Sequence, residues 1–190
     1  MRRVTRQNEP APTSLEIFIC SLVDRGFKTA YEFHREAGLS VGSSVPALSR
    51  LERAGLLYKQ VVSTGGRRSN SYSISPSGRK LIRTAWRSLL QQQSPSDTEA
   101  ILRIVELANH YSAPAEQITV YLNRAASRKY RVAEKLANGN RQEIDGFEYR
   151  CAKTDLERVR LKAESDFLRS IADSFRLSTR KPRRKTKKDR

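Results

Sequence analysis

The sequence is poor in cysteine, aromatic residues and acidic side chains, and it contains no long hydrophobic run. Its two cysteines, Cys20 and Cys151, have no Cys or His partner at the spacing of a metal site, so we expect reduced thiols without a disulfide framework. No apolar stretch approaches the roughly 20 residues of a membrane-spanning helix. The residues before Pro10 also contain no apolar stretch of the kind that a secretory signal requires. These absences argue against a secreted, transmembrane or zinc-finger protein.

Residues suited to catalysis are also scarce. The two histidines, His34 and His110, stand alone, and acidic residues alternate with basic ones, so that no carboxylate pair stands out as acid and base. Gly65 and Gly66 lack the helix start and the Lys-Ser/Thr pair that follow the glycines of a phosphate-binding loop. We therefore predict no catalytic residue, no metal, no cofactor and no enzymatic activity.

Positive charge is what the sequence has in excess. It contains 37 Lys and Arg against 20 Asp and Glu, with a formal net charge of +17 and a pI near 10.5. Residues 1–88 carry +9, residues 89–177 carry +1 and residues 178–190 carry +7. This distribution favours a polyanion-binding domain joined to a nearly neutral assembly domain. Nucleic acid is the first candidate partner, and an anionic membrane surface is the second.

Two short helices are expected near the N-terminus, after an aperiodic basic segment. Thr13 with Glu16, and Thr29 with Glu32, have the form of capping boxes at helix starts. Gly38 is placed to end the second helix. Apolar residues at helical spacing follow each capping box, so the two helices are predicted to pack on each other.

A third helix is expected to begin near Ser43 or Ser44, with a proline tolerated in its first turn. Its apolar side consists of Val45, Leu48, Leu51 and Gly55. The opposite side has small, polar and cationic residues without a carboxylate: Pro46, Ser49, Arg50 and Arg53. A helix whose outer face is slim and free of carboxylates fits the major groove of DNA.

A β-hairpin and a fourth helix follow the third helix. A β-rich run over 56–62 and an alternating run over 71–74 flank a Gly-Gly loop that carries Arg67 and Arg68. Ser75-Pro76 then restarts a helix. The expected order is therefore three helices, a two-stranded hairpin and a fourth helix, which is the order of a winged helix-turn-helix. In that fold the third helix enters the major groove, while the hairpin, called the wing, lies along the backbone or in the minor groove.

The C-terminal part is predicted to be helical. Ser96 and Glu99 form a further capping box, and a final helix is expected from about Tyr149 to Leu177. Its apolar residues cover more than half of the circumference, which one neighbouring helix cannot bury, so contact with a second subunit is expected. The residues predicted to form this interface are Leu156, Val159, Ala163, Phe167, Leu168, Ile171 and Phe175.

The fold class that follows is mainly α with a small antiparallel β-hairpin wing, in which an N-terminal winged helix-turn-helix precedes a C-terminal helical dimerisation region. The expected divisions are a flexible basic arm over 1–12, a DNA-binding domain over 13–90, a dimerisation or effector region over 96–177 and a disordered basic tail over 178–190.

Three stretches also resemble one family, the PadR-type transcriptional regulators. Residues 44–57 (SVPALSRLERAGLL) look like the recognition-helix signature of that family, residues 30–33 (AYEF) are similar to its second-helix motif, and residues 72–79 (YSISPSGR) look like its wing-to-helix signature. The matches cover roughly residues 14–85. Val45 stands where the family commonly has an aromatic residue, and Ala30 replaces a usual glycine. The resemblance implies a bacterial, dimeric, usually repressing regulator that responds to a small ligand, with a C-terminal region like that of the longer-tailed branch of the family.

The sequence therefore predicts a homodimeric, sequence-specific regulator of the bacterial cytoplasm and nucleoid, with double-stranded DNA as partner and no membrane insertion. The residues expected to contact DNA are Ser43, Ser44, Pro46, Ser49, Arg50, Arg53, Arg67, Arg68, Ser69 and Asn70. Trp86 could line an effector pocket or serve only in packing. Two alternatives stay open: an assembly module that contacts protein or membrane through its winged domain and basic tail, and a non-specific nucleoid-binding protein.

Overall fold

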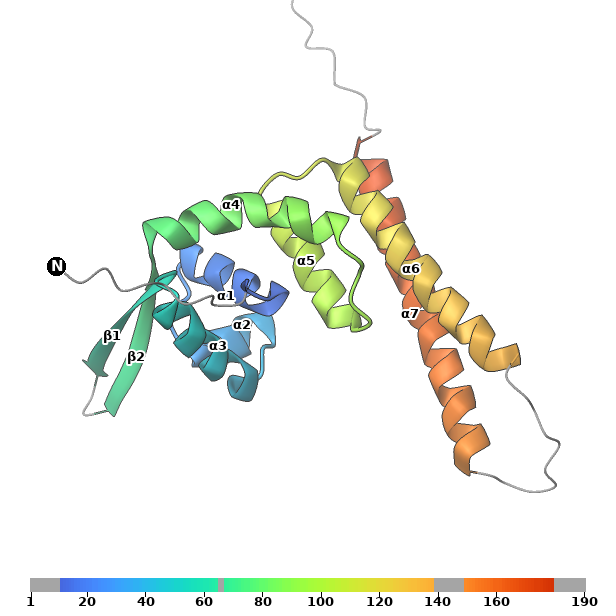
Figure 1. Ribbon diagram of the computed structural model, residues 1–190, viewed down its shortest axis with the longest axis horizontal. Coiled ribbons are helices and arrows are strands. Elements are labelled where there is room, and N and C mark those ends of the chain that lie inside the picture. The colour runs from blue at the N-terminus through green and yellow to red at the C-terminus, as the bar shows by residue number, and fades with distance from the viewer. Residues whose placement is uncertain (1–10, 65–66, 139–148, 180–190) are drawn as a thin grey trace, which may run out of the picture. The chain divides into compact units, whose positions relative to one another are not determined.

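The computed structural model divides into two compact units, residues 1–89 and 90–190, which we call unit 1 and unit 2 (Figure 1). It describes residues 11–64, 67–138 and 149–179, without the side chains of Thr64, Arg67, Arg68, Ser178 and Thr179. The predicted arm over residues 1–12, apart from Ala11 and Pro12, lies outside the described residues, as does most of the predicted tail. Two helical units joined near residue 90, the first carrying a β-hairpin, agree with the predicted fold class.

The first two helices of unit 1 begin where the sequence predicts. Helix α1 (Ser14–Asp24) and helix α2 (Ala30–Ala37) both start with a complete capping box, formed by Thr13 with Glu16 and by Thr29 with Glu32. Gly38 ends α2 in the left-handed conformation, at φ 64°, where an L side chain would be strained.

Helix α3 (Val41–Arg53) begins earlier than predicted, because Ser40 and not Ser43 or Ser44 caps it. The Ser40 hydroxyl accepts a hydrogen bond from the Ser43 backbone N–H at 3.1 Å. Pro46 consequently lies in the second turn and not the first, where it has no N–H to give to the Gly42 carbonyl. The side chains that pack α3 onto the core are Ala47, Leu48 and Leu51.

Strands β1 (Leu57–Thr64) and β2 (Arg67–Ile74) form the predicted antiparallel hairpin, with Leu57 opposite Ile74 and Thr64 opposite Arg67. One backbone bond ties its base to the loop before α2, since the Tyr72 N–H donates to the Lys28 carbonyl at 2.9 Å. The base is also anchored by burial, because the side chains of Leu57 and Tyr72 lie in the core of unit 1.

Helix α4 (Pro76–Gln91) fixes the other side of the hairpin. The Ser75 hydroxyl donates to the Gly55 carbonyl at 2.7 Å and accepts from the Gly78 N–H at 3.0 Å. Gly78 lies so close to the chain that follows α3 that an added Cβ would stand 2.3 Å from the Leu56 carbonyl oxygen. The end of α3, the base of the hairpin and the start of α4 are therefore joined at one tight crossing.

Unit 2 contains α5 (Thr98–His110), α6 (Ala115–Asn138) and α7 (Tyr149–Thr179). The capping box predicted for Ser96 is wrong: the carboxylate of Asp97 caps α5, and the Ser96 carbonyl instead accepts a bond from Lys129 at 2.7 Å. None of the described helices is long and apolar enough to span a bilayer.

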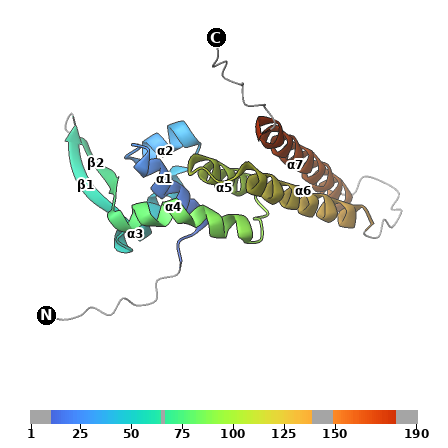
Figure 2. The ribbon, with the colours of Figure 1, turned by 90° about the horizontal axis from the view of Figure 1, so that it is seen from above.

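Helices α6 and α7 lie side by side and antiparallel (Figures 1 and 2). Their hydrogen bonds show the direction, because the Ser165 hydroxyl donates to the Ala126 carbonyl while Thr119, one end of α6, bonds to the Ala172 carbonyl. Between them lies a buried polar cluster in which the Lys129 ammonium donates to Glu164 at 2.5 Å and the Thr98 hydroxyl to the same oxygen at 2.9 Å. Burial alone would raise the pKa of Glu164, but these two bonds outweigh it and lower the pKa.

Candidate nucleic-acid interface

The outward side of α3 carries no carboxylate. Its exposed residues are Val41, Gly42, Ser43, Val45, Pro46, Ser49, Arg50 and Arg53. The single acidic residue of the helix, Glu52, is half-buried and pairs with Lys59 of β1 at 3.9 Å. This outward side, which we call the α3 face, therefore has the slim and acid-free character that a groove-binding helix requires.

Two residues of α3 lie on the opposite side from the one predicted. Ser44 is fully buried, and its hydroxyl donates back to the Ser40 carbonyl at 2.9 Å, so Ser44 is not available to DNA. Val45, expected on the apolar inner side, is 50% exposed on the α3 face. The error arises because the packing of α3 on α1 and α2, which α3 contacts, sets the rotation of the helix. Ser43, Pro46 and Ser49 are exposed as predicted.

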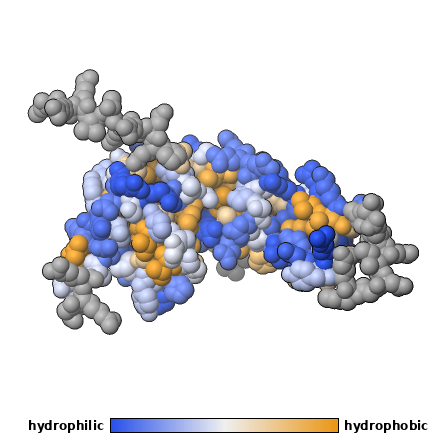
Figure 3. Space-filling view, turned by 60° about the horizontal axis from the view of Figure 1, so that its bottom comes forward, coloured by the Kyte–Doolittle hydropathy of each residue, from blue (hydrophilic) through white to orange (hydrophobic). Residues whose placement is uncertain are grey.

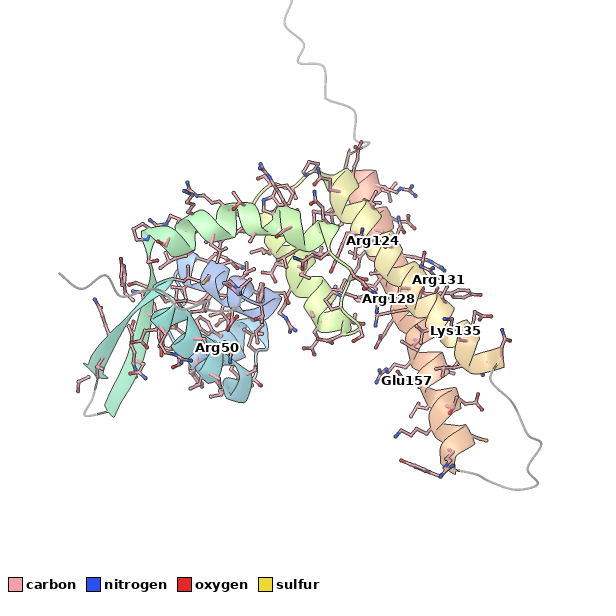
Figure 4. The ribbon with its side chains drawn as sticks, viewed as in Figure 1. Arg50, Arg124, Arg128, Arg131, Lys135 and Glu157 are labelled. Atoms are coloured by element: carbon pink, nitrogen blue, oxygen red, sulfur yellow. The ribbon has the colours of Figure 1, made fainter. Side chains whose placement is uncertain are left out.

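Arg50 is engaged in an ion pair that the sequence analysis missed. Its Nε–H donates to Glu16 Oε1 at 2.5 Å, with the Arg50 side chain 51% exposed and that of Glu16 only 7% exposed (Figure 4). Burial would raise the pKa of Glu16, but the bonds from Arg50 and Thr13 outweigh burial and lower the pKa below the ordinary 4.5. Arg50 therefore joins α3 to the first turn of α1 and compensates a buried carboxylate.

The start of the described chain lies beside this ion pair. Ala11 and Pro12 border a cavity of about 250 Å³ together with Arg50, Arg53 and the segment that ends α3. The remaining lining residues are Thr13, Glu16, Leu51, Ala54 and Leu56. The chain preceding α1 thus enters unit 1 next to the C-terminal half of the α3 face.

The hairpin lies next to α3, because β1 begins at Leu57, shortly after α3 ends at Arg53, and contacts it. Ser69 and Asn70 are exposed, as expected for the wing, and the Ser69 hydroxyl bonds to the Val62 carbonyl at 3.5 Å. Arg67 and Arg68 begin β2, and their side chains lie outside the described residues. Residues 58–63 of β1 are also all exposed, and none of them was predicted as a site residue.

The turn between α2 and α3 completes the arrangement. Gly38, Leu39 and Ser40 join the two helices, which is the short glycine-containing turn of a helix-turn-helix. Another helix precedes this pair, while a two-stranded hairpin and a fourth helix follow it. Unit 1 is a winged helix-turn-helix domain.

The part of the chain that the structure describes contains no cluster of side chains that could hold a metal ion. No group of three or more His, Cys, Asp or Glu side chains gathers within residues 11–64, 67–138 and 149–179. Cys20 is buried inside the winged domain, where burial raises the pKa of its thiol to about 12 and keeps it protonated. Trp86 is buried on α4.

Unit 2 exposes an apolar stripe on α7, on the side away from α6. Figure 3 shows that hydrophobic residues lie among hydrophilic ones on the surface of the molecule. Leu156 is 71% exposed, Val159 58% and Phe167 49%, and Ala163 lies exposed between them. Ile171 and Phe175 are half-buried. Leu168 does not belong to this stripe, contrary to the prediction, because it lies between Ser165 and Ala172 on the face that packs on α6 and is fully buried.

Solved structures similar to this chain were found, but their sequence identities and TM-scores are low. No family model matches the sequence, and no curated protein matches it. A PadR-like transcriptional regulator from Bacillus cereus is 16% identical at a TM-score of 0.34, covering 88% of this chain and 98% of its own. PadR of Bacillus subtilis, solved in complex with operator DNA, is 14% identical at a TM-score of 0.36, covering 86% of this chain and 99% of its own.

A third structure, from Streptococcus mutans, is 18% identical at a TM-score of 0.33, covering 87% of this chain and 98% of its own. Two of the three similar structures thus bear the name of the family that the sequence motifs resemble.

Proposed function

We propose that this chain is a sequence-specific DNA-binding regulator of transcription whose α3 enters the major groove. The observation that carries the proposal is the α3 face, which is exposed over its whole length and contains no carboxylate. DNA carries one negative charge per about 1.7 Å of its axis, so even one exposed carboxylate on this face would be repelled. A slim row of Gly42, Pro46 and Ser49 lets the helix backbone approach the base edges.

The residues divide into those that read bases and those that fix register. Ser43, Pro46 and Ser49, on the first three turns of α3, would face base edges, and Arg53 would reach a guanine edge or a phosphate. On the wing, Ser69, Asn70, Arg67 and Arg68 would contact the sugar–phosphate backbone, which positions the domain without specifying sequence. The Arg50 side chain is 51% exposed, but its ion pair with Glu16 makes it first a positioning residue.

We also propose that two copies associate through α7. The stripe of Leu156, Val159, Ala163 and Phe167 lies opposite the face of α7 that packs on α6, and no residue of the stripe is charged. Burying it against a second copy removes apolar area from water at about 25 cal/mol per Å². A two-fold dimer would present two α3 helices to half-sites one helical turn apart, about 34 Å.

The regulator that we propose divides at the segment between residues 90 and 96, with a DNA-binding part over 13–90 and a dimerising part over 96–177. Occupancy of an operator near a promoter would repress transcription. Repression and response to a small ligand rest on the resemblance of the sequence motifs to PadR-type regulators, and a promoter–reporter fusion with and without added aromatic compounds tests both.

Selection of bound fragments from a random duplex pool tests the central proposal. A homodimeric regulator is expected to enrich a palindrome with half-sites about 10 base pairs apart. Enrichment of no motif at physiological salt, with retention of all fragments, would identify a non-specific nucleoid-binding protein instead. Retention of no duplex at low salt by the full chain would eliminate DNA binding altogether.

A further inference from the structure

The outer side of α6 carries a row of cations that the proposed function does not use. Arg124, Arg128, Arg131 and Lys135 recur at intervals of four, three and four residues, so they lie along one side of the helix (Figure 4). We call these four residues the α6 cation row. Its first and last residues are eleven positions apart, which is about 16 Å at 1.5 Å per residue, with neighbouring cations about 5–6 Å apart.

No carboxylate of the described residues pairs with the α6 cation row. Of the two acidic residues in α6, Glu134 pairs with Lys162 of α7 at 2.8 Å, and Glu116 lies two turns before Arg124. Arg131 bonds through Nε to a neutral group of its own helix, the Ser127 carbonyl, at 3.3 Å. The row thus has no ion-pair partner among the described residues, although Asp97 and Glu157 line one cavity with Arg128.

Several arginines of α7, in the same unit, are paired with carboxylates, unlike the cations of the α6 cation row. Each of several arginines there has an acidic partner three residues earlier: Asp155 with Arg158 at 3.3 Å, Glu157 with Arg160 at 2.9 Å, and Asp166 with Arg169 at 3.4 Å. The net charge of residues 89–177, only +1, thus hides a difference between two helices: from Asp155 onward the arginines of α7 are paired with carboxylates, whereas α6 leaves one side cationic. Solubility alone would not require this difference.

Two members of the row are held in place before any partner binds. The Arg124 guanidinium donates to the carbonyls of Leu90 and Gln92, and Arg128 donates to the Ser94 carbonyl at 2.6 Å. Bonds to neutral carbonyls order a guanidinium without cancelling its charge. An ordered guanidinium loses less conformational entropy when it binds an anion such as phosphate.

We infer that the α6 cation row binds the phosphates of duplex DNA, as a backbone contact additional to the winged domain. The inference rests on the proposed function, because a chain that binds no DNA would have no such partner. Cations about 5–6 Å apart along a straight rod match the dense, regular charge of a phosphate backbone better than the single charge of a small anion. Such a contact would add affinity for every sequence alike and would release counterions.

The salt dependence of DNA binding by the full chain tests this inference. The variant Arg131→Ala/Lys135→Ala removes two cations of the row and leaves the bonds of Arg124 and Arg128 in place. The matched control Arg150→Ala/Lys153→Ala removes two exposed cations from the start of α7. On a random-sequence duplex, the slope of log K against log salt is expected to shrink by up to about 1.8 in the first variant, since each phosphate contact contributes about 0.9. The control is expected to keep the wild-type slope.

Several outcomes would overturn the inference. If the wild type binds DNA and both variants show its slope, the row does not touch DNA and the proposed function stands without it. If the row variant loses binding to vesicles containing an anionic phospholipid while its DNA slope is unchanged, the row is a membrane-contacting surface. If the wild type binds no duplex, the proposed function fails and the inference fails with it. Circular dichroism of both variants checks that the fold is intact.

Discussion

Arg50 shows how one side chain can serve the scaffold of a binding surface. Because it compensates the buried carboxylate of Glu16, Arg50→Ala is expected to lower the free energy of unfolding by about 1–3 kcal/mol at neutral pH. The Glu16 pKa lies below 4.5 in the folded chain, so its ionic contribution is present above pH 4.5 and is lost as the pH falls through the folded pKa.

The difference between wild type and Arg50→Ala should therefore shrink in acid, as urea denaturation at pH 7 and below pH 4.5 would measure. Arg53→Ala is the matched control, because the Nε of Arg53 bonds to the Ser49 carbonyl at 3.4 Å and Arg53 has no ion pair with any described residue. A pH-independent difference for Arg50→Ala, or an equal loss for Arg53→Ala, would contradict the assignment of Arg50 to the Glu16 carboxylate.

Gly78 gives a second prediction at the scale of one residue. Alanine normally stabilises a helix interior relative to glycine by about 0.5–1 kcal/mol. At Gly78 the new Cβ would stand 2.3 Å from the Leu56 carbonyl oxygen, so α4 would have to move away from the end of α3. We expect Gly78→Ala to lower the thermal midpoint, with a cost of about 1–3 kcal/mol.

Gly42→Ala serves as the control for Gly78→Ala. Gly42 also lies in a helix, but an added Cβ there meets no atom within 4 Å. Calorimetry should show no loss of stability for Gly42→Ala. Equal behaviour of the two variants would mean that the crossing between α3 and α4 is looser than its geometry indicates.

At the scale of elements, α3 and the hairpin are expected to contribute differently to DNA binding. Arg67→Ala/Arg68→Ala in the wing should weaken binding to selected and random duplexes by similar factors, because phosphate contacts do not depend on sequence. Ser49→Ala, on the α3 face, should instead change the ratio of the two affinities. Fluorescence anisotropy with both duplexes measures this ratio. A selective loss in the wing variant would assign base readout to the hairpin.

At the scale of the whole molecule, α7 is expected to set the oligomeric state. Phe167→Glu places a charge in the uncharged stripe, and its burial against a second copy would require desolvation of the new carboxylate. Light scattering after size exclusion should therefore give the monomer mass of 21.7 kDa for this variant and twice that value for the wild type.

Gln117→Glu, an exposed change on α6, should leave the dimer intact. A wild-type chain that is monomeric at micromolar concentration, or a Phe167→Glu variant that stays dimeric, would contradict association through this stripe. A monomeric Phe167→Glu variant that still binds a single half-site would separate the contribution of dimerisation from that of the winged domain.

The sequence by itself determined the elements whose signals are local. Thr13 with Glu16, and Thr29 with Glu32, cap helices through bonds three residues apart, and the Gly-Gly loop between two β-rich runs places the hairpin. The sequence also indicated that α7 has more apolar residues than one neighbouring helix can bury, and in the structure the exposed stripe is the part that α6 does not cover. Some local predictions were nevertheless wrong by a few residues. Ser40 caps α3 in place of Ser43 or Ser44, and Asp97 caps α5 in place of Ser96.

Only the tertiary structure decided which way each helix turns and which charges meet. The pair of Arg50 with Glu16 joins residues 34 positions apart, and the burial of Ser44 and Leu168 depends on how α3 and α7 rotate against their neighbours. Hydrophobic patterning fixes a helical face only to within about one residue's rotation, whereas close packing of side chains selects one rotation. For that reason the sequence identified the winged domain, and the three-dimensional packing identified the side chains it presents.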